Sequence, residues 1–504
     1  MLNPTTMLGR LEAIVDASGV AAHIEALLPV GVRPRQLRVR TLLVGMLLIL
    51  SDGRPGHLAR VHQALVDLCE DDRRRLGVVV DWKGGPHLLT YRQTEYVFSA
   101  VVRVLEKDVP DGAPTEVLGR VLDALVEASV GADGKDRSSS LAIDWTDVES
   151  FSTRRTKANG AYADPEASWG HRKGGGPGEK HELFFGYYLS LATMVGDERG
   201  DEVPELVRRM QLGSCDHDPV PALVGVLGDL AGSGATLGDV VADSGYAHRV
   251  EEHFALPLRA AGARLVMDLH PHDRGTQGTH QGAICHNGNL YCPKTPVALF
   301  DLGPLSRGAS KEETAVHDTG TAELSRYKLG RIAGTDPDGY HRVACPAVMG
   351  KVRCPRRPSS MALSYERPEV LAPPEHPPPC CTQVTITVPP SVNAKTAQRH
   401  DYPSAPWRRS YARRSAAERS NARIKDPATI DVARGWCRVM GLTSMSLLLT
   451  CALVVRNLAV ADAFSERQAE NERRAAAGLP PRTRRRRRKT LGDLVGAAPA
   501  NAPP

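Results

Sequence analysis

The stretch "ATLGDVVADSGYAHRVEEHFALPLRAAGARLVMDL", residues 235–269, decides the fold class of this chain. It reads as a short apolar strand that ends before Asp243, a glycine turn, a helix and a second strand from Arg264 to Leu269. Strand, helix and strand in this order predict an α/β fold. Open α/β sheets place their chemistry at the carboxyl ends of their strands, so Asp243 is a candidate site residue.

A second acid stands in a comparable place. The segment "SSSLAIDWTDVESF" (Ser138–Phe151) puts a β-rich apolar run directly before Asp144, and "HELFFGYYLSLATMVG" (His181–Gly196) reads as a further strand or a pair of strands. Asp144 is therefore the second candidate, with Asp147 as a less favoured substitute. The structural alternatives are a strand-end or turn role for Asp144 and a helix N-cap for Asp243.

The rest of the chain divides into regions of different composition and predicted secondary structure. Its 504 residues, 41% of them hydrophobic, suffice for two to four domains. We predict a helical N-terminal domain over residues 1–135, an α/β core over 136–271, a β-rich insertion over 272–400, the second part of the core over 401–465, and a basic, disordered tail over 466–504.

Charge points to a polyanionic partner. The formal net charge is +6, and basic residues concentrate in runs at Arg33–Arg40, Arg408–Lys425 and Arg484–Lys489. Residues 33–65 join the first run to two helices across a Gly-Arg-Pro-Gly turn, which suits a helix-turn-helix-like unit that grips DNA. The alternative for each run is a solvated surface, and similar helix pairs occur in proteins that bind no nucleic acid.

No secretory signal opens the chain, so we expect a cytoplasmic, nucleoid-associated protein without a membrane partner. The apolar run Val439–Val455 reaches only the lower edge of spanning length and is interpreted as a buried core helix. Ten cysteines in such a chain favour reduced thiols or a metal site over a disulfide framework.

The stretch "SYARRSAAERSNARIK", residues 410–425, holds a single carboxylate among five basic side chains. On one helix, Tyr411, Arg414, Glu418 and Lys425 would share an arc of about 60°. An Arg one turn before a Glu also matches an ordinary surface ion pair, worth about 0.3–0.5 kcal/mol. Spacing alone therefore leaves a structural role for Glu418 open.

The order Tyr, two residues, Arg, three residues, Glu, six residues, Lys is similar to the signature of a large group of bacterial insertion-sequence transposases. "VADSGYAHR", with Asp243, Gly245, Tyr246 and Arg249, is similar to the second block of that family. The chain thus resembles a DDE transposase over about residues 138–460. The resemblance implies an RNase H-like fold, a mixed sheet flanked by helices, with a β-rich insertion between Asp243 and Glu418.

The resemblance also implies a function. Asp144, Asp243 and Glu418 would hold Mg²⁺, for which Mn²⁺ can substitute, and the DNA contacts would come from Tyr411, Arg414, Lys425, Tyr246 and Arg249. Three carboxylates suit hard cations that promote phosphodiester cleavage. The expected activity is cut-and-paste transposition by a homodimer that pairs the terminal inverted repeats and joins them to target DNA. The alternatives are a nuclease without strand transfer and an inactive DNA-binding protein.

The insertion carries a second metal hypothesis. Cys285 and Cys292, with Cys345 and Cys354, could supply four thiolates to a structural Zn²⁺, and Cys380 and Cys381 lie nearby in the sequence. The six and eight intervening residues exceed the usual two to four of a zinc knuckle. Buried free thiols are the alternative.

Overall fold

The computed structural model describes residues 6–30, 35–82, 85–106, 116–152, 162–172, 182–306, 308–426 and 430–482. The chain separates into two compact units, Met1–Leu458 and Ala459–Pro504. The basic run Arg484–Lys489 and Arg33 lie outside the described residues.

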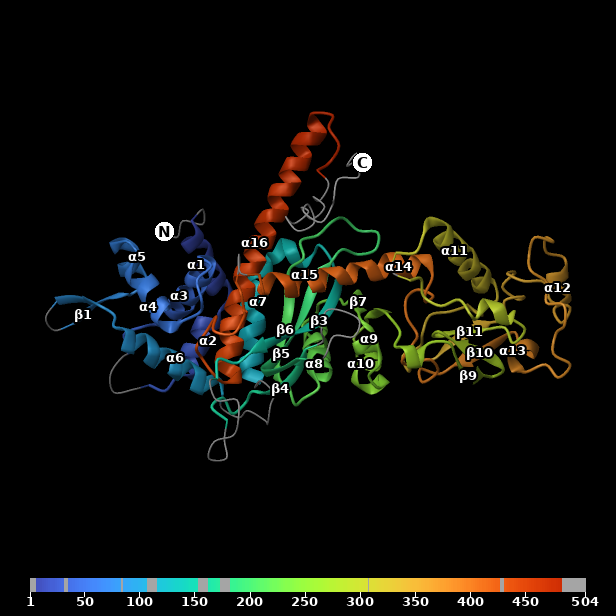
Figure 1. Cartoon of the computed structure of the whole chain (residues 1–504), viewed down its shortest axis with the longest axis horizontal. Helices are drawn as coiled ribbons and strands as arrows, with labels where there is room; N and C mark the ends of the chain where they lie inside the picture. Colours follow the sequence, from blue (N-terminus) through green and yellow to red (C-terminus); the bar gives the residue numbers. More distant parts are fainter. Residues whose placement is uncertain are drawn as a thin grey trace, which may run out of the picture. The chain divides into compact units, whose positions relative to one another are not determined.

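A six-strand mixed sheet forms the centre of the first unit (Figure 1). Its strands are β4 (Ser168–Arg172), β5 (Glu182–Val195), β6 (Val207–Ser214), β3 (Ser140–Glu149), β7 (Asp239–Ala242) and β8 (Arg264–Met267). β5 pairs antiparallel with β3, β4 and β6, whereas β7 runs parallel to both β3 and β8. The α/β class and the mixed sheet packed against helices are confirmed.

The strand register sets two acids side by side. β3 and β7 pair through Leu141 with Val240 and Ala142 with Val241. Extending this parallel register by two residues sets Asp144 opposite Asp243, which directly follows β7. The two candidate acids therefore share one edge of the sheet.

Two short helices carry the basic stretch across the sheet. α14 (Ala405–Tyr411) and α15 (Ser415–Ile424) are joined by a 3-10 turn over Ala412–Arg414, and α15 packs on β3 and β5 (Figure 1). Ala416 and Ala417 lie in an apolar cluster with Ala142 of β3. The stretch is helical as predicted, but Tyr411 ends one helix and Glu418 lies in the first turn of the next.

The N-terminal region is mainly helical. Its helices are α1 (Met7–Ser18), α2 (Val20–Leu27), α3 (Val39–Ser51), α4 (Leu58–Val66), α5 (Glu70–Arg75), α6 (Tyr91–Leu105) and α7 (Glu116–Lys135). A small antiparallel pair, β1 (Val79–Trp82) and β2 (Gly85–Leu88), was not part of the prediction. Helical residues such as Leu42 and Val101 share one apolar core with Tyr187 and Leu189 of β5.

The insertion contains short strands, as its composition predicts. Two three-stranded antiparallel sheets form it, one from β9 (Thr276–His280), β10 (Ala283–His286) and β11 (Asn289–Tyr291), the other from β12 (Gly330–Arg331), β13 (His341–Ala344) and β14 (Thr385–Val388). The helix α11 (Lys311–Arg326) lies between the two sheets in sequence.

The long helix α16 (Leu442–Ala476) follows the second part of the core. Among the described residues it is the one helix long and apolar enough to cross a membrane, yet 72% of its most apolar window is buried inside the protein. Leu447, Leu448 and Cys451 belong to the main apolar core. This burial agrees with the prediction of a core helix.

Candidate active site

Asp144 lies near the middle of β3 with its carboxylate held by two donors. The N–H of Trp145 donates to Oδ1 at 3.0 Å, and the side-chain amide of Asn421 on α15 donates to Oδ2 at 3.1 Å. No described cation makes an ion pair with Asp144 within 4.0 Å. Its charge is therefore hydrogen-bonded but not directly neutralised.

Asp243 begins the short helix α9 (Ser244–Ala247) as its N-cap. Its Oδ1 accepts from the N–H groups of Gly245 at 2.9 Å and Tyr246 at 3.4 Å. A Cβ on Gly245 would lie 2.9 Å from the Trp145 ring, so glycine permits this close approach of α9 to β3. The N-cap role that sequence reasoning left open is present, and it orients the carboxylate toward Arg414.

Arg414 joins the second and third acids. Its guanidinium lies 3.4 Å from Asp243 Oδ2 and 2.5 Å from Glu418 Oε1. The Glu418 side chain is 55% exposed, whereas that of Arg414 is 21% exposed. The acid and the arginine on neighbouring helical turns thus make the ion pair expected of their spacing, and the same arginine reaches the sheet edge.

The electrostatics of the three acids show that they are close. Burial is the main cause that raises the pKa of Asp144 to about 6, and the negative charge of Asp243 raises it further. The charge of Arg414 and the Trp145 N–H lower this pKa, and Glu418 raises it. One arginine does not offset three carboxylates, so the site favours an additional positive charge.

Asp147, the substitute for Asp144, is fully engaged in ion pairs. Lys425 Nζ lies 2.7 Å from Asp147 Oδ1, and Arg172 of β4 binds the other oxygen through two nitrogens. Burial alone would raise the pKa of Asp147, but hydrogen bonds from Arg172 and Lys425 hold it below its usual value. Asp144 is therefore the acid that faces Asp243, and Lys425 contacts a carboxylate.

Tyr411 stacks on Trp407 of α14, with ring centroids 4.8 Å apart and planes 12° from parallel. Burial is the main cause that raises the pKa of Tyr411 well above its usual value, and the charges of Asp268, Asp243 and Glu418 raise it further. The phenol therefore stays protonated beside the three acids and can serve as a hydrogen-bond donor.

The remaining two predicted DNA contacts are Tyr246, on α9, and Arg249, which follows this helix. Tyr246 is completely buried and packs between the tilted rings of Trp145 and Phe254, and its hydroxyl has no partner among the described residues. Arg249 forms an ion pair with Asp218, the N-cap of α8 (Pro219–Gly232), at 2.9 Å. Tyr246 thus packs α9 onto the sheet, where DNA does not reach its side chain, and Arg249 ties α9 to α8.

Sequence reasoning missed Asn421 and Trp145. Asn421 donates to Asp144, while its own carbonyl oxygen is buried without a described partner. Its position three residues after Glu418 on α15 was a usable signal, because residues at that spacing share a helix face. Trp145 follows Asp144 directly and covers α9, a role that the sequence did not indicate.

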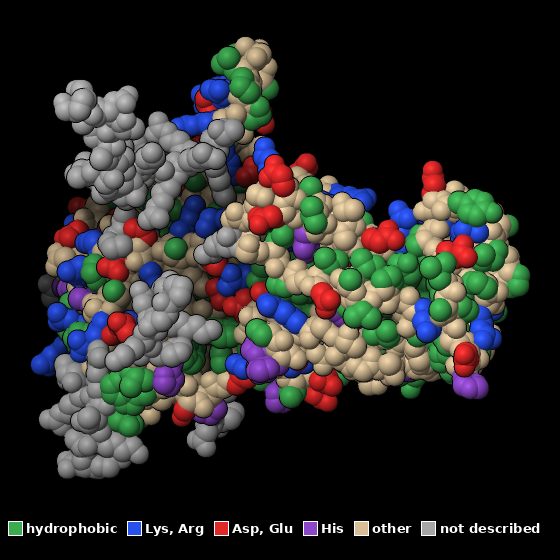
Figure 2. All heavy atoms as spheres, turned by 45° about the vertical axis from the view of Figure 1, so that its right-hand side comes forward, with side chains coloured by type: hydrophobic (Ala, Val, Ile, Leu, Met, Phe, Trp, Pro, Cys, Tyr) green, Lys and Arg blue, Asp and Glu red, His purple; other side chains and the backbone are tan. Residues whose placement is uncertain are grey.

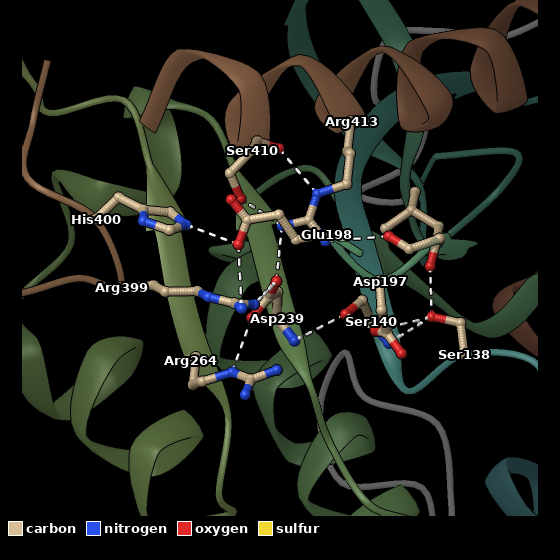
Figure 3. A network of polar contacts seen from close by, with 12 residues as sticks. Ser138, Ser140, Asp197, Glu198, Asp239, Arg264, Arg399, His400, Ser410 and Arg413 are labelled. Carbon is tan, nitrogen blue, oxygen red and sulfur yellow. Dashed lines mark hydrogen bonds and ion pairs between the residues drawn. The ribbon is translucent and has the colours of Figure 1, made fainter. Parts of the chain in front are cut away.

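The opposite end of β7 holds a different cluster (Figure 3). Asp239, the first residue of β7, is completely buried and binds Arg264, Arg399 and Arg413. Burial alone would raise its pKa, but hydrogen bonds from Arg399 and Arg413 outweigh burial and lower it. A surface hollow of about 800 Å³ beside this cluster is lined by further charged residues, including Glu198 and Arg409.

Some basic residues of the predicted N-terminal DNA-binding segment already form ion pairs within the protein. Arg40 forms ion pairs with Glu12 and Asp16, and Arg35 pairs with Glu25. Arg38 is exposed and makes no ion pair with a described residue. On the face drawn in Figure 2, basic side chains are interspersed with acidic ones.

The four cysteines proposed for zinc do not share one cluster. Cys285 packs with Cys380, whereas Cys292 and Cys345 belong to a second apolar cluster that Cys354 contacts. All ten cysteines are free thiols in this structure. Cys285 lies apart from the other three cysteines of the predicted zinc set, because β10 directs its side chain into the neighbouring cluster.

Comparison of the chain with models of known protein families found no match, and comparisons with curated proteins and with solved structures found none either.

Proposed function

We propose that this protein is a DDE-type transposase that cuts DNA at the ends of a mobile element and joins those ends to target DNA. The observation that carries the proposal is the convergence of Asp144, Asp243 and Glu418 on one sheet edge around Arg414. These residues lie in the motifs on which the resemblance rests. The mixed sheet is compatible with the RNase H-like fold that the resemblance implies.

The donor set fits a hard divalent cation. Carboxylate oxygens are the ligands that Mg²⁺ and Mn²⁺ prefer. Burial is the main cause of the raised pKa of Asp144, and the negative charges of Asp243 and Glu418 add to it. Asp144, Asp243 and Glu418 would hold the metal. When bound, Mg²⁺ would stabilise charge on the attacking and leaving oxygens of the phosphodiester.

Other side chains would position the acids and the DNA. Asn421 orients the Asp144 carboxylate through a hydrogen bond at 3.1 Å. Arg414 spans Asp243 and Glu418 and would turn toward a DNA phosphate once a cation takes over their charge. Lys425 contacts Asp147, so its predicted DNA contact requires that it exchange this carboxylate for phosphate.

The partners follow from this reaction. We infer that two copies pair the terminal inverted repeats in a synaptic complex, since joining both ends to one target needs two active sites. A nuclease without strand transfer is the second candidate, and it would use the same three acids. The two candidates differ only in whether the cut end is joined.

The test is an end-DNA assay with Mg²⁺ or Mn²⁺ that scores nicking and joining to a target plasmid. Glu418→Gln, Asp144→Asn and Asp243→Asn are each expected to lower both activities at least 100-fold, with end-DNA binding retained. Asp147→Asn is the matched control and should keep cleavage within about tenfold, because Asp147 already binds Lys425 and Arg172. Wild-type cleavage by Glu418→Gln would refute the three-acid site, and cleavage without joining would favour the nuclease.

A further inference from the structure

Four cysteines from separate parts of the insertion line one small cavity. They are Cys292, just after β11, Cys345, just after β13, Cys354, and Cys381 in the short helix α13 (Pro379–Thr382). The cavity measures about 10 Å³. A space of this size is comparable to a single water molecule or ion.

The thiols lie close enough to influence one another. Burial is the main cause that raises the pKa of Cys292 to about 12, and the charges that Cys345, Cys381 and Cys354 would carry raise it further. Thiolate sulfur is the ligand type that zinc and other soft metals favour, so four cysteines around one cavity suit such an ion.

Backbone donors already point at two of the sulfurs. The N–H groups of Ala347 and Val348 donate to the Cys345 sulfur, and the N–H of Lys294 donates to that of Cys292. In each case the donors lie two or three residues after a cysteine that is followed by proline. Donors of this kind orient and stabilise a thiolate ligand.

We propose that Cys292, Cys345, Cys354 and Cys381 bind one structural Zn²⁺ ion. Four thiolates suit tetrahedral zinc. Cys381 replaces Cys285, because Cys381 lines the cavity and Cys285 does not. This inference does not depend on the proposed transposase activity.

Binding would draw the sulfurs inward. Among the described residues, only His248, His270 and Asp273 bring three ligand atoms within 4.8 Å of one another, so the cysteine sulfurs stand farther apart than ligands of one ion. A change of χ1 rotamer moves a cysteine sulfur without moving the backbone. The His248 group is a weaker candidate, because Lys395 Nζ lies 2.9 Å from its carboxylate.

The ion would join the two halves of the insertion. Cys292 directly follows β11 of the first sheet, whereas Cys345 directly follows β13 of the second. The apolar cluster that contains Cys285 draws residues from both sheets, and both this cluster and the one that contains Cys292 and Cys345 are small, with eight buried residues in each. Small modules of this kind commonly need a metal or a disulfide to be stable, and the insertion has no disulfide.

The test is metal analysis of the full chain purified without chelator. We expect about one zinc per chain, lost in Cys381→Ser and Cys354→Ser but retained in Cys380→Ser and Cys285→Ser. Cys380 is the matched control for Cys381 because it is its sequence neighbour. Absence of zinc from the wild type, or iron in its place, would overturn the proposal, as would zinc that depends on Cys285 and not on Cys381.

Two measurements keep the test decisive if a serine variant fails to fold. Cys381→His supplies another zinc ligand and should retain the ion that Cys381→Ser loses. Wild-type protein loaded with Co²⁺ should show the charge-transfer absorption of a tetrahedral thiolate site. A Co²⁺ spectrum typical of octahedral oxygen ligands would overturn the proposal without any variant.

Discussion

The two ends of strand β7 hold acids of opposite character. At the amino end, Asp239 is buried and neutralised by Arg264, Arg399 and Arg413, so its pKa is lowered despite burial (Figure 3). At the carboxyl end, Asp243 follows β7 beside Asp144 of the neighbouring strand β3. Asp144 lacks a direct ion pair with a described cation, and burial together with the charge of Asp243 raises its pKa.

This difference separates a structural site from a candidate functional one. A buried carboxylate with matched arginines stabilises the fold only as long as every partner remains. Carboxylates that repel one another reduce stability and are retained where an external cation is to be bound. The two ends of β7 therefore predict opposite effects when an acid is replaced by its neutral amide.

The largest effect is expected at the amino end. Asp239→Asn should lower the free energy of unfolding by about 3 kcal/mol or more, because Arg399 and Arg413 would lose their buried partner. Urea unfolding at pH 7 measures this loss. Arg264→Gln is the control, and since the Arg264 side chain is 53% exposed it should lose less than about 1 kcal/mol. Equal losses in both variants would contradict a special role for Asp239.

At the carboxyl end of β7 we expect a neutral amide to raise the free energy of unfolding. In wild-type protein, the pKa of Asp144 is about 6 in the folded state and 3.8 in the reference state, so charging this acid opposes folding as pH rises between these values. Asp144→Asn should therefore raise the free energy of unfolding at pH 7 by up to about 3 kcal/mol. The gain should shrink as pH falls and vanish below about pH 4.

The measurement is urea unfolding of both proteins from pH 4 to pH 7.5 without divalent metal. Adding Mg²⁺ should stabilise the wild type more than Asp144→Asn, because ligand binding to the folded state raises its stability. Asn421 can turn its amide to accept from the new asparagine, so the variant should retain this contact. A destabilised Asp144→Asn variant at pH 7 would contradict the conclusion that the charge of Asp144 opposes folding.

Whether each of these acidic sites could be predicted from the sequence depends on how far apart its interacting residues lie in the chain. Asp144 and Asp243 each follow an apolar run in the sequence, and Glu418 shares a local motif with Arg414, so short-range patterns indicated all three. The cluster at Asp239 was not predicted, because Arg264, Arg399 and Arg413 lie 25, 160 and 174 residues away from it. Ion pairs between residues far apart in the chain leave no periodic pattern in the sequence.

The same limit explains two further differences. Asp147 could not be separated from Asp144 because its partners Arg172 and Lys425 come from other elements. The zinc hypothesis grouped cysteines by their order in the chain, whereas the fold brings Cys381 to the cavity and directs Cys285 elsewhere. Tyr246 fits a local motif, but its complete burial follows only from Trp145 and Phe254 around it.

The smallest effect tests the same distinction between paired and unpaired charge in the N-terminal region. Arg38 is exposed without an ion pair to a described residue, whereas Arg40 binds Glu12 and Asp16. If this region grips DNA, Arg38→Ala should weaken end-DNA binding a few-fold and reduce the slope of log affinity against log salt concentration by about 1. Stability should change by less than about 0.5 kcal/mol.

Arg40→Ala should show the reverse pattern, because Glu12 is completely buried and would lose one of its two arginine partners. We expect a loss of at least about 1 kcal/mol in the free energy of unfolding, with the salt slope unchanged. Binding titrations between about 50 and 200 mM salt, run beside urea unfolding, separate the two outcomes. An unchanged slope in Arg38→Ala would remove this residue from the DNA contact surface, because each phosphate contact that is lost must change counterion release.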